Sequence, residues 1–238
     1  MFFSFCAWAQ TTDSLSDAEI QGRQLAQQLC EGWPESATNT GVLQIHNAQG
    51  KHFQIPVKCE VVVTATNWRS IYESTDAAGN SATLEVIHAP GAPNRYYVTE
   101  TKASGPSDAK PGAVRGDELF APFAGSDFWI ADLGLEFFHW PAQKILKKEL
   151  KRSRGCTVLE STNPMPSPGG YSRVVSWIDE ETLGIVQADA YDAGGKLLKE
   201  FLPKDFKKVK GQWQVGSMRI DNVLTGSRTQ LEFHLGGE

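Results

Sequence analysis

The stretch YSRVVSWIDEETLGIVQADAYDAGGKLLKEF, residues 171–201, decides the fold of this 238-residue chain. It holds three short segments rich in apolar and β-branched residues, 171–178, 184–191 and 196–201. Charged residues and the Gly194–Gly195 pair mark the turns between them. Such runs, broken by turn signals and with no long helix between them, are typical of strands that follow one another in an antiparallel meander. The stretch therefore predicts three neighbouring strands of one sheet.

A two-residue period in the first of these strands places alternate side chains on opposite faces of the sheet. One face then carries Val174, Ser176 and Ile178, and the other carries Arg173, Val175 and Trp177. We expect the meander to continue without a break to Phe233, through residues 212–220 and 228–233.

The same pattern extends toward the N-terminus. Segments 41–47, 51–57, 59–65, 68–74, 82–89 and 95–101 are short, β-branched or alternating, and residues 144–153 and 156–162 form a hairpin around Arg154–Gly155. Residues 104–112 are expected to be a loop. The chain is thus mainly β, with roughly ten to twelve strands, and a twisted antiparallel sheet of that size has to curl or close.

One amphipathic helix precedes the strands. Ser16-Asp17-Ala18-Glu19 has the form of a capping box, and Pro34 is expected to end the helix. Residues on one helical face are Ala18, Gly22, Leu25, Leu29 and Trp33.

An aromatic segment, SDFWIADLGLEFFHWP at residues 126–141, follows neither the helical nor the strand period. Phe128, Trp129 and Ile130 are consecutive, Asp127 is placed to cap a short turn of helix, and Pro141 ends the segment. We expect a compact cover over the mouth of the curled sheet, bordering an apolar cavity that accepts an acyl chain. The alternative is that the segment only plugs the core.

Bulk properties and motifs exclude several functions. The net charge of -5 argues against nucleic-acid binding. Neither a nucleophile elbow nor a nucleotide-binding glycine loop is found, and the five histidines lack metal-site spacing, so we expect no enzyme activity, cofactor or metal. Two basic runs, residues 144–154 and 204–210, could face anionic headgroups or an acidic partner, or could be edge-strand lysines that prevent aggregation.

The N-terminus and the cysteines indicate export. Residues 1–9 end in Ala7-Trp8-Ala9 and are interpreted as the remnant of a cleaved signal peptide, which leaves residues 10–238 as one domain in the periplasm. In an oxidising compartment Cys30 and Cys59 are the favoured disulfide pair, since one closes the helix and the other begins a strand. The alternative is that these two thiols and Cys156 are all free.

An ordered set of segments in the second half of the chain resembles the outer-membrane lipoprotein-sorting proteins, the LolA-like periplasmic lipoprotein carriers. The segments are SDFWIADLG (126–134), GCTVLEST-NP (155–164), VVSWID (174–179), AYDAGGKLLKEF (190–201), VKGQWQVGSMRI (209–220) and TGSRTQLEF (225–233). The resemblance implies an incomplete β-barrel, LolA/LolB-like, whose open side is covered by helices and whose concave face holds lipid acyl chains.

The function expected on this basis is a carrier that binds lipid or lipoprotein acyl chains in an apolar groove and sorts lipoproteins to the outer membrane. Its partners would be the cargo and an inner- or outer-membrane transfer protein, and the carrier itself would be a monomer. The residues expected to line or cover the groove are Phe128, Trp129, Leu133, Leu135, Phe137, Phe138 and Trp140. The alternative is a non-catalytic envelope scaffold of the same fold with no transported cargo.

Overall fold

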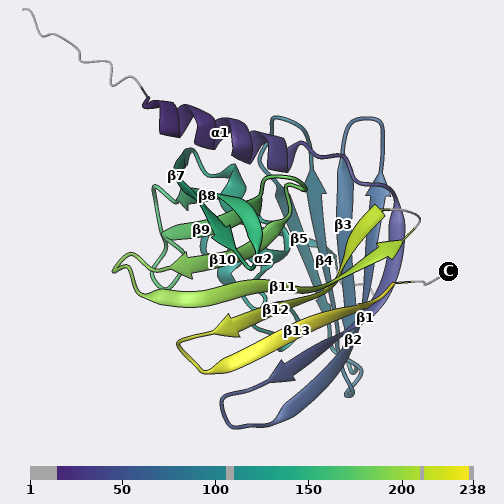
Figure 1. Cartoon of the computed structure of the whole chain (residues 1–238). Helices are drawn as coiled ribbons and strands as arrows, with labels where there is room; N and C mark the ends of the chain where they lie inside the picture. Colours follow the sequence, from purple (N-terminus) through teal and green to yellow (C-terminus); the bar gives the residue numbers. More distant parts are fainter. Residues whose placement is uncertain (1–14, 106–109, 210–211, 236–238) are drawn as a thin grey trace, which may run out of the picture.

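A computed structural model describes residues 15–105, 110–209 and 212–235 of the chain. Within these ranges the chain forms one antiparallel sheet of 13 strands, one helix of 14 residues and several short helical pieces (Figure 1). The helical elements are α1 (Asp17–Cys30), η1 (Gly116–Phe120), η2 (Phe123–Gly125), α2 (Ile130–Leu133) and η3 (Glu136–His139). The strands are β1 (Ala37–His46), β2 (His52–Val63), β3 (Trp68–Thr75), β4 (Ser81–His88), β5 (Arg95–Thr101), β6 (Gly112–Val114), β7 (Ala142–Lys151), β8 (Arg154–Thr162), β9 (Arg173–Asp179), β10 (Ile185–Tyr191), β11 (Leu197–Val209), β12 (Gln212–Asn222) and β13 (Ser227–His234).

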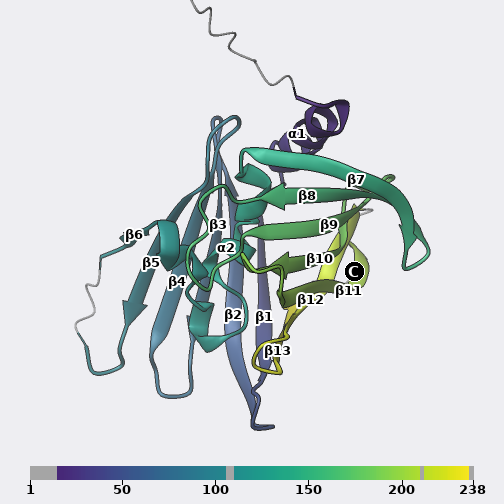
Figure 2. The same ribbon diagram turned by 90° about the vertical axis from the view of Figure 1, so that its left-hand side faces the viewer.

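The sheet is made of two meanders, β1–β6 and β7–β13, that join where β1 pairs with β13. The order β6-β5-β4-β3-β2-β1-β13-β12-β11-β10-β9-β8-β7 leaves β6 and β7 as edges, so the sheet does not close into a barrel. Figure 2 shows the two halves running at a steep angle to one another and enclosing α2 between them. The expected curled sheet is confirmed.

The strands differ from the expectation in two places. Segments 51–57 and 59–65 form one strand, β2, and β6 lies in part where only a loop was expected. Pro56 pairs with Val42 of β1, but the ladder to β3 starts only at Val57 opposite Ser74. At Pro56 the side of β2 toward β3 is therefore an edge, where the missing N–H of proline removes no hydrogen bond.

The meander from β9 to β13 confirms the central expectation. Each strand pairs with the next, and no helix interrupts residues 171–191. Val174 and Ile178 are buried on the concave side, whereas Trp177 faces the other side, where the Lys151 ammonium lies 4.0 Å from its ring centroid. The β7–β8 turn is at Arg152 and Ser153, two residues before the expected position.

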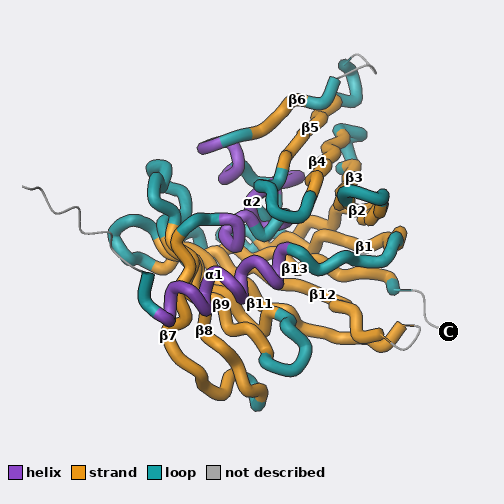
Figure 3. The backbone as a smooth tube through the Cα atoms, turned by 90° about the horizontal axis from the view of Figure 1, so that it is seen from above, coloured by secondary structure: helices purple, strands orange, loops and turns teal. Residues whose placement is uncertain are grey.

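Helix α1 lies across one end of the sheet and contacts β7 (Figure 3). The Ser16–Glu19 capping box is formed, with Ser16 Nα donating to Glu19 Oε2 at 2.8 Å. Gly22 allows the close approach, because a Cβ atom there would lie 2.6 Å from the backbone nitrogen of Lys144. The helix ends at Cys30 rather than at Pro34, and Trp33 instead stands 5.2 Å from the ring of Trp68.

The expected disulfide is not present. Cys30, Cys59 and Cys156 are free thiols. Cys59 is buried in a hydrophobic cluster under β1–β5, whereas Cys30 packs against a second cluster under β8–β11. Burial raises the pKa of both thiols to about 12.

Some of the expectations lie outside the described residues. These concern the signal-peptide remnant at residues 1–9 and, in the second basic run, Lys210. In the part of the chain that the structure describes, no helix combines the length and the hydrophobicity needed to span a bilayer.

Candidate functional site

The aromatic segment, residues 126–141, lies inside the curled sheet and forms α2 and η3 with short extended links (Figures 2 and 3). It therefore fills the concave face as an internal bridge rather than covering its rim. Gly134 lies against β5, where a Cβ atom would come within 2.2 Å of the Tyr96 hydroxyl oxygen. A side chain at this position would push the segment off the sheet.

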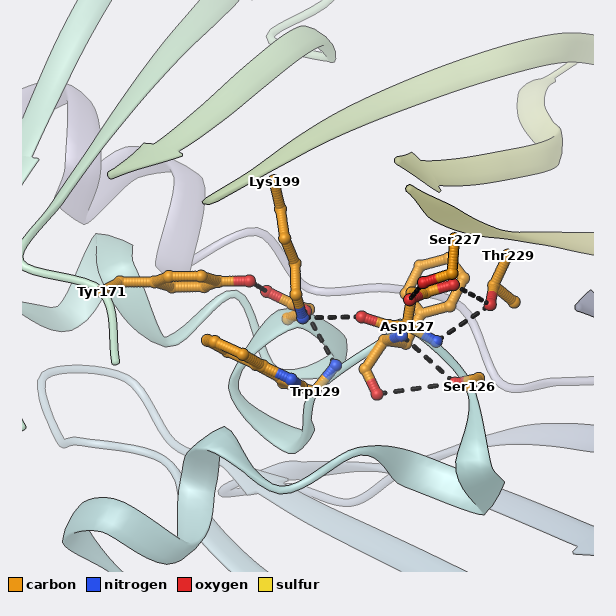
Figure 4. Close-up of polar contacts among 9 residues, drawn as sticks. Ser126, Asp127, Trp129, Tyr171, Lys199, Ser227 and Thr229 are labelled. Carbon is orange, nitrogen blue, oxygen red and sulfur yellow. Dashed lines mark hydrogen bonds and ion pairs between the residues drawn. The ribbon is translucent and has the colours of Figure 1, made fainter. Parts of the chain in front are cut away.

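One end of the segment is tied to β13 (Figure 4). The Asp127 amide donates to Thr229 Oγ1 at 2.9 Å, and the hydroxyls of Thr229 and Ser227 donate to the Asp127 carboxylate at 2.8 and 2.5 Å. Asp127 is thus not the cap of α2, as its position before the helix suggested. The N-cap is Trp129, whose backbone amide donates to the carboxylate of Asp132 in the first turn of α2 at 2.8 Å.

The middle of the segment is held by a buried lysine from β11. Lys199 Nζ donates to the Asp127 carbonyl at 2.6 Å, lies 3.4 Å from Asp132 Oδ2 and sits 3.4 Å above the Trp129 ring centroid. Tyr171 donates to Asp132 Oδ1 at 2.8 Å and stacks on Trp129 (Figure 4). Burial lowers the pKa of Lys199 to about 8, although Asp132 opposes the shift.

The far end of the segment is bound to the opposite half of the sheet and to β7. The Tyr96 hydroxyl on β5 donates to Glu136 Oε2 at 2.8 Å, and Asn94 Nδ2 donates to the Gly134 carbonyl at 2.8 Å. Gln143 on β7 donates to the carbonyl of Phe137 at 2.9 Å. Burial raises the pKa of Glu136 to about 7. Contacts to several strands make the segment a fixed part of the fold.

The seven expected groove residues are divided between two hydrophobic clusters. Phe128 and Leu133 belong to the cluster under β1–β5, and Phe137 and Phe138 to the cluster under β8–β11, where Trp129, Leu135 and Trp140 are only partly buried. Most of these side chains are therefore core residues as well as candidate lining residues.

A cavity of about 320 Å³ opens beside the segment. Four of the expected residues line it, namely Phe128, Leu133, Leu135 and Phe138. Its other apolar lining comes from Leu29, Tyr72, Leu183, Ile185, Phe201, Pro203, Phe206, Val215 and Met218. Asp132 is the only charged residue in this lining, and its carboxylate already has the three partners described above.

The other three expected residues lie elsewhere. Phe137 borders a separate void of about 20 Å³ next to Lys199, which is room for one water molecule. Trp129 stacks on Tyr171, and the partly buried Trp140 packs against the second cluster.

Strained backbone borders the cavity. Among the described residues, Leu135 and Leu183 are two of five non-glycine positions with positive φ, at 49° and 58°. Both line the cavity, one from the aromatic segment and one from the β9–β10 turn. Each non-glycine residue with positive φ costs of order 1–3 kcal/mol of folding free energy, and such residues cluster at active sites and ligand-binding sites.

No group of His, Cys, Asp and Glu side chains suited to a metal ion occurs within residues 15–105, 110–209 and 212–235. The site is thus described by its apolar shape and by the polar contacts that fix the aromatic segment.

Comparisons with known proteins agree on the fold. The structure is similar to a DUF1329 family protein from Desulfovibrio piger, with 21% identity, a TM-score of 0.73, and coverage of 94% of this chain and 96% of that chain. It is also similar to a domain described as an outer membrane lipoprotein-sorting protein from Vibrio parahaemolyticus, with 21% identity, a TM-score of 0.71, and coverage of 92% and 95%. A LolA superfamily protein from Nitrosomonas europaea matches with 16% identity, a TM-score of 0.62, and coverage of 92% and 93%. The LolA-like fold expected from the sequence is confirmed.

A family model described as "Uncharacterized protein" matches residues 106–235, more than half of the chain. The chain belongs to this family. No curated protein matches the sequence.

Proposed function

We propose that this protein, a member of that family with a LolA-like fold, binds the acyl chain of a lipid or lipoprotein in the cavity beside the aromatic segment. The observation that carries the proposal is the cavity itself, which measures about 320 Å³ and has an almost wholly apolar lining. Ligand pockets range from about 300 to 1,000 Å³ and are lined mainly by hydrophobic side chains.

Burial of an acyl chain gives enough free energy for useful affinity. One buried methylene contributes about 0.8 kcal/mol, so ten contribute about 8 kcal/mol before ordering costs. That gross energy corresponds to a Kd near 1 μM. Binding of this kind requires apolar area and shape but no catalytic group.

The proposed role as a carrier is supported by the way the site is built. The aromatic segment is hydrogen-bonded to β5, β7, β11 and β13, so it presents a preformed wall to the chain. We place the protein in the periplasm, as a non-catalytic, monomeric, single-domain carrier over residues 10–238 that exchanges acylated cargo with a membrane-bound transfer partner. The similarity of fold to a described lipoprotein-sorting domain supports this role.

A fluorescent fatty acid tests the proposal. Leu183→Asp places a carboxylate in the cavity lining, and aspartate tolerates the positive φ of this turn better than leucine. We expect Leu183→Asp to weaken probe binding at least tenfold with an unchanged far-UV circular dichroism spectrum. Leu224→Asp is the matched control, because Leu224 is an exposed turn leucine away from the cavity. A wild-type protein that binds no probe, or a Leu183→Asp variant that binds like the control, would overturn the proposal.

One observation favours a second candidate, the non-catalytic envelope scaffold. Phe128, Phe137 and Phe138 are at most 5% exposed, so they fill the core whether or not a ligand is present. The probe experiment separates the two functions, because a scaffold predicts a folded wild-type protein that takes up no acyl chain.

A further inference from the structure

A second hollow, of about 540 Å³, adjoins the apolar cavity. The two share five lining residues: Gly184, Ile185, Pro203, Phe206 and Val215. Phe206 is 47% exposed at this boundary. The shared residues place the second hollow, called the outer chamber below, directly beside the apolar cavity.

The outer chamber differs from the inner cavity in its charge. Arg152, Arg154 and Lys204 line it together with Asp179 and Glu181. Arg154 is committed to Asp179, whose carboxylate it approaches to 2.6 Å and whose side chain is only 4% exposed. The remaining charged residues of the lining are Arg152 and Lys204, which are positive, and Glu181, which is negative. The net charge of these three residues is positive.

Arg152 is held in the chamber by its turn. It occupies the β7–β8 turn with Ser153, at φ values of 50° and 64°. Its Nη1 donates to the carbonyl of Pro203 in β11 at 3.2 Å. A two-residue hairpin turn of this shape favours Asn-Gly, so an Arg-Ser pair here is strained. The bond to Pro203 holds the guanidinium in the chamber, and among the described residues its other N–H groups have no hydrogen-bond partner, so they can bind a ligand.

Lys204 follows Pro203 directly and completes the basic side of the chamber. It is exposed and takes part in none of the ion pairs formed within the described residues. Its pKa is lowered by partial desolvation and by the positive charges of Arg219 and Arg152, which outweigh Asp221 and Asp205. Arg219 itself is paired with Asp221 at 2.6 Å. An anion between Arg152 and Lys204 would relieve their mutual repulsion.

We propose that Arg152 and Lys204 bind the phosphate of an acyl lipid whose chain occupies the adjoining apolar cavity. This inference rests on the proposed acyl-chain binding and names the class of ligand, a phospholipid with a net negative headgroup. A guanidinium suits a phosphate because its fork of N–H donors binds two oxygens at once, and lysine adds a point charge. The basic residues 144–154 and 204–210 noted in the sequence thus meet at one place through Arg152 and Lys204.

Lipids with equal chains and different headgroups test the inference. Wild-type protein should bind dihexanoyl phosphatidylglycerol, which is anionic, at least tenfold more tightly than zwitterionic dihexanoyl phosphatidylcholine. The double variant Arg152→Asn/Lys204→Gln should lose that preference, and asparagine accepts the positive φ of the turn. Lys196→Gln, which removes an exposed turn lysine outside both hollows, is the matched control and should keep it.

The uncharged probe N-phenyl-1-naphthylamine separates this inference from the proposed function. Its binding should be unchanged in Arg152→Asn/Lys204→Gln and lost in Leu183→Asp. Retained probe binding with equal affinity for the two lipids would overturn the headgroup site alone, whereas absence of all probe and lipid binding would overturn both proposals. Inorganic phosphate should bind far more weakly than phosphatidylglycerol, and equal affinity would show a free-phosphate site and refute the lipid assignment.

Discussion

Replacement of Lys199 by methionine is expected to destabilise the protein by about 3 kcal/mol, since removing one partner of a buried ion pair costs roughly 3–5 kcal/mol. The substitution removes the donor to Asp127 and the charge beside Asp132 while nearly keeping the volume of a side chain that is 3% exposed. We expect the lower end of that range because Asp132 keeps the Tyr171 hydroxyl and the Trp129 amide as donors.

Urea unfolding of the wild type and three variants measures this effect. Lys196→Met, at an exposed lysine of the neighbouring turn, should change the free energy of unfolding by less than about 0.5 kcal/mol. Asp132→Asn added to Lys199→Met should recover part of the loss, because no uncompensated carboxylate then remains. A loss below about 1 kcal/mol in Lys199→Met, or no recovery in the double variant, would refute the assignment of Lys199 as the anchor of the aromatic segment.

Lys199, buried beside Asp132, also makes the free energy of unfolding depend on pH. Burial lowers the pKa of Lys199 to about 8 in the folded state, whereas the unfolded chain holds this proton until about pH 10.4. Between these values the unfolded state binds more protons, so this lysine makes the free energy of unfolding rise with pH. The stability gap between wild type and Lys199→Met should therefore widen by about 2 kcal/mol from pH 7.5 to pH 9.5. A difference in free energy of unfolding that stays constant from pH 7.5 to pH 9.5 would contradict the lowered pKa of Lys199 in the folded protein.

Three further outcomes follow from other parts of the fold. Burial raises the pKa of Glu136 to about 7, so the stabilisation from its protonated form is complete below pH 4.5 and is lost as the pH rises through 7. In urea unfolding, Glu136→Gln should therefore be more stable than wild type by about 3 kcal/mol at pH 8 and equally stable near pH 4.5. Gly22→Ala should lower the melting temperature although alanine favours helices by about 1 kcal/mol, because its Cβ would lie 2.6 Å from a backbone nitrogen of β7; a rise would show that α1 does not pack that closely. Cys30 and Cys59 should both react with a thiol reagent in denaturant without reduction, and Cys59 should be protected in the native protein at pH 8; a missing thiol would reveal a disulfide.

The local part of the fold was predictable from sequence. The period of two in residues 171–191 and the Ser16–Glu19 capping box involve neighbours in the chain, and both formed as expected. The curl of the sheet followed from the number of strands alone. The placement of the disulfide failed because the ends of two elements carry no information on the distance between them, and Cys30 and Cys59 entered different clusters.

The candidate site was only partly predictable, since it depends on contacts between distant segments. The aromatic segment identified four lining residues, but Leu183, Phe201 and Met218 come from a turn and two strands whose local pattern resembles that of any half-buried strand. Lys199 lies in KLLKEF, where a lysine normally faces solvent, and only its meeting with Asp132 explains its burial. Charged residues inside an otherwise apolar core are therefore the part of this site that sequence periodicity cannot locate.

Native mass spectrometry of the protein purified from its own cell envelope without detergent extraction tests acyl-chain binding most directly. We expect an added mass that organic extraction identifies as a phosphate-bearing acyl lipid or an acylated protein. This mass should be lost in Leu183→Asp but not in Leu224→Asp. An envelope-purified wild-type protein that carries no acylated molecule, and that takes up none when phosphatidylglycerol is added, would contradict acyl-chain binding.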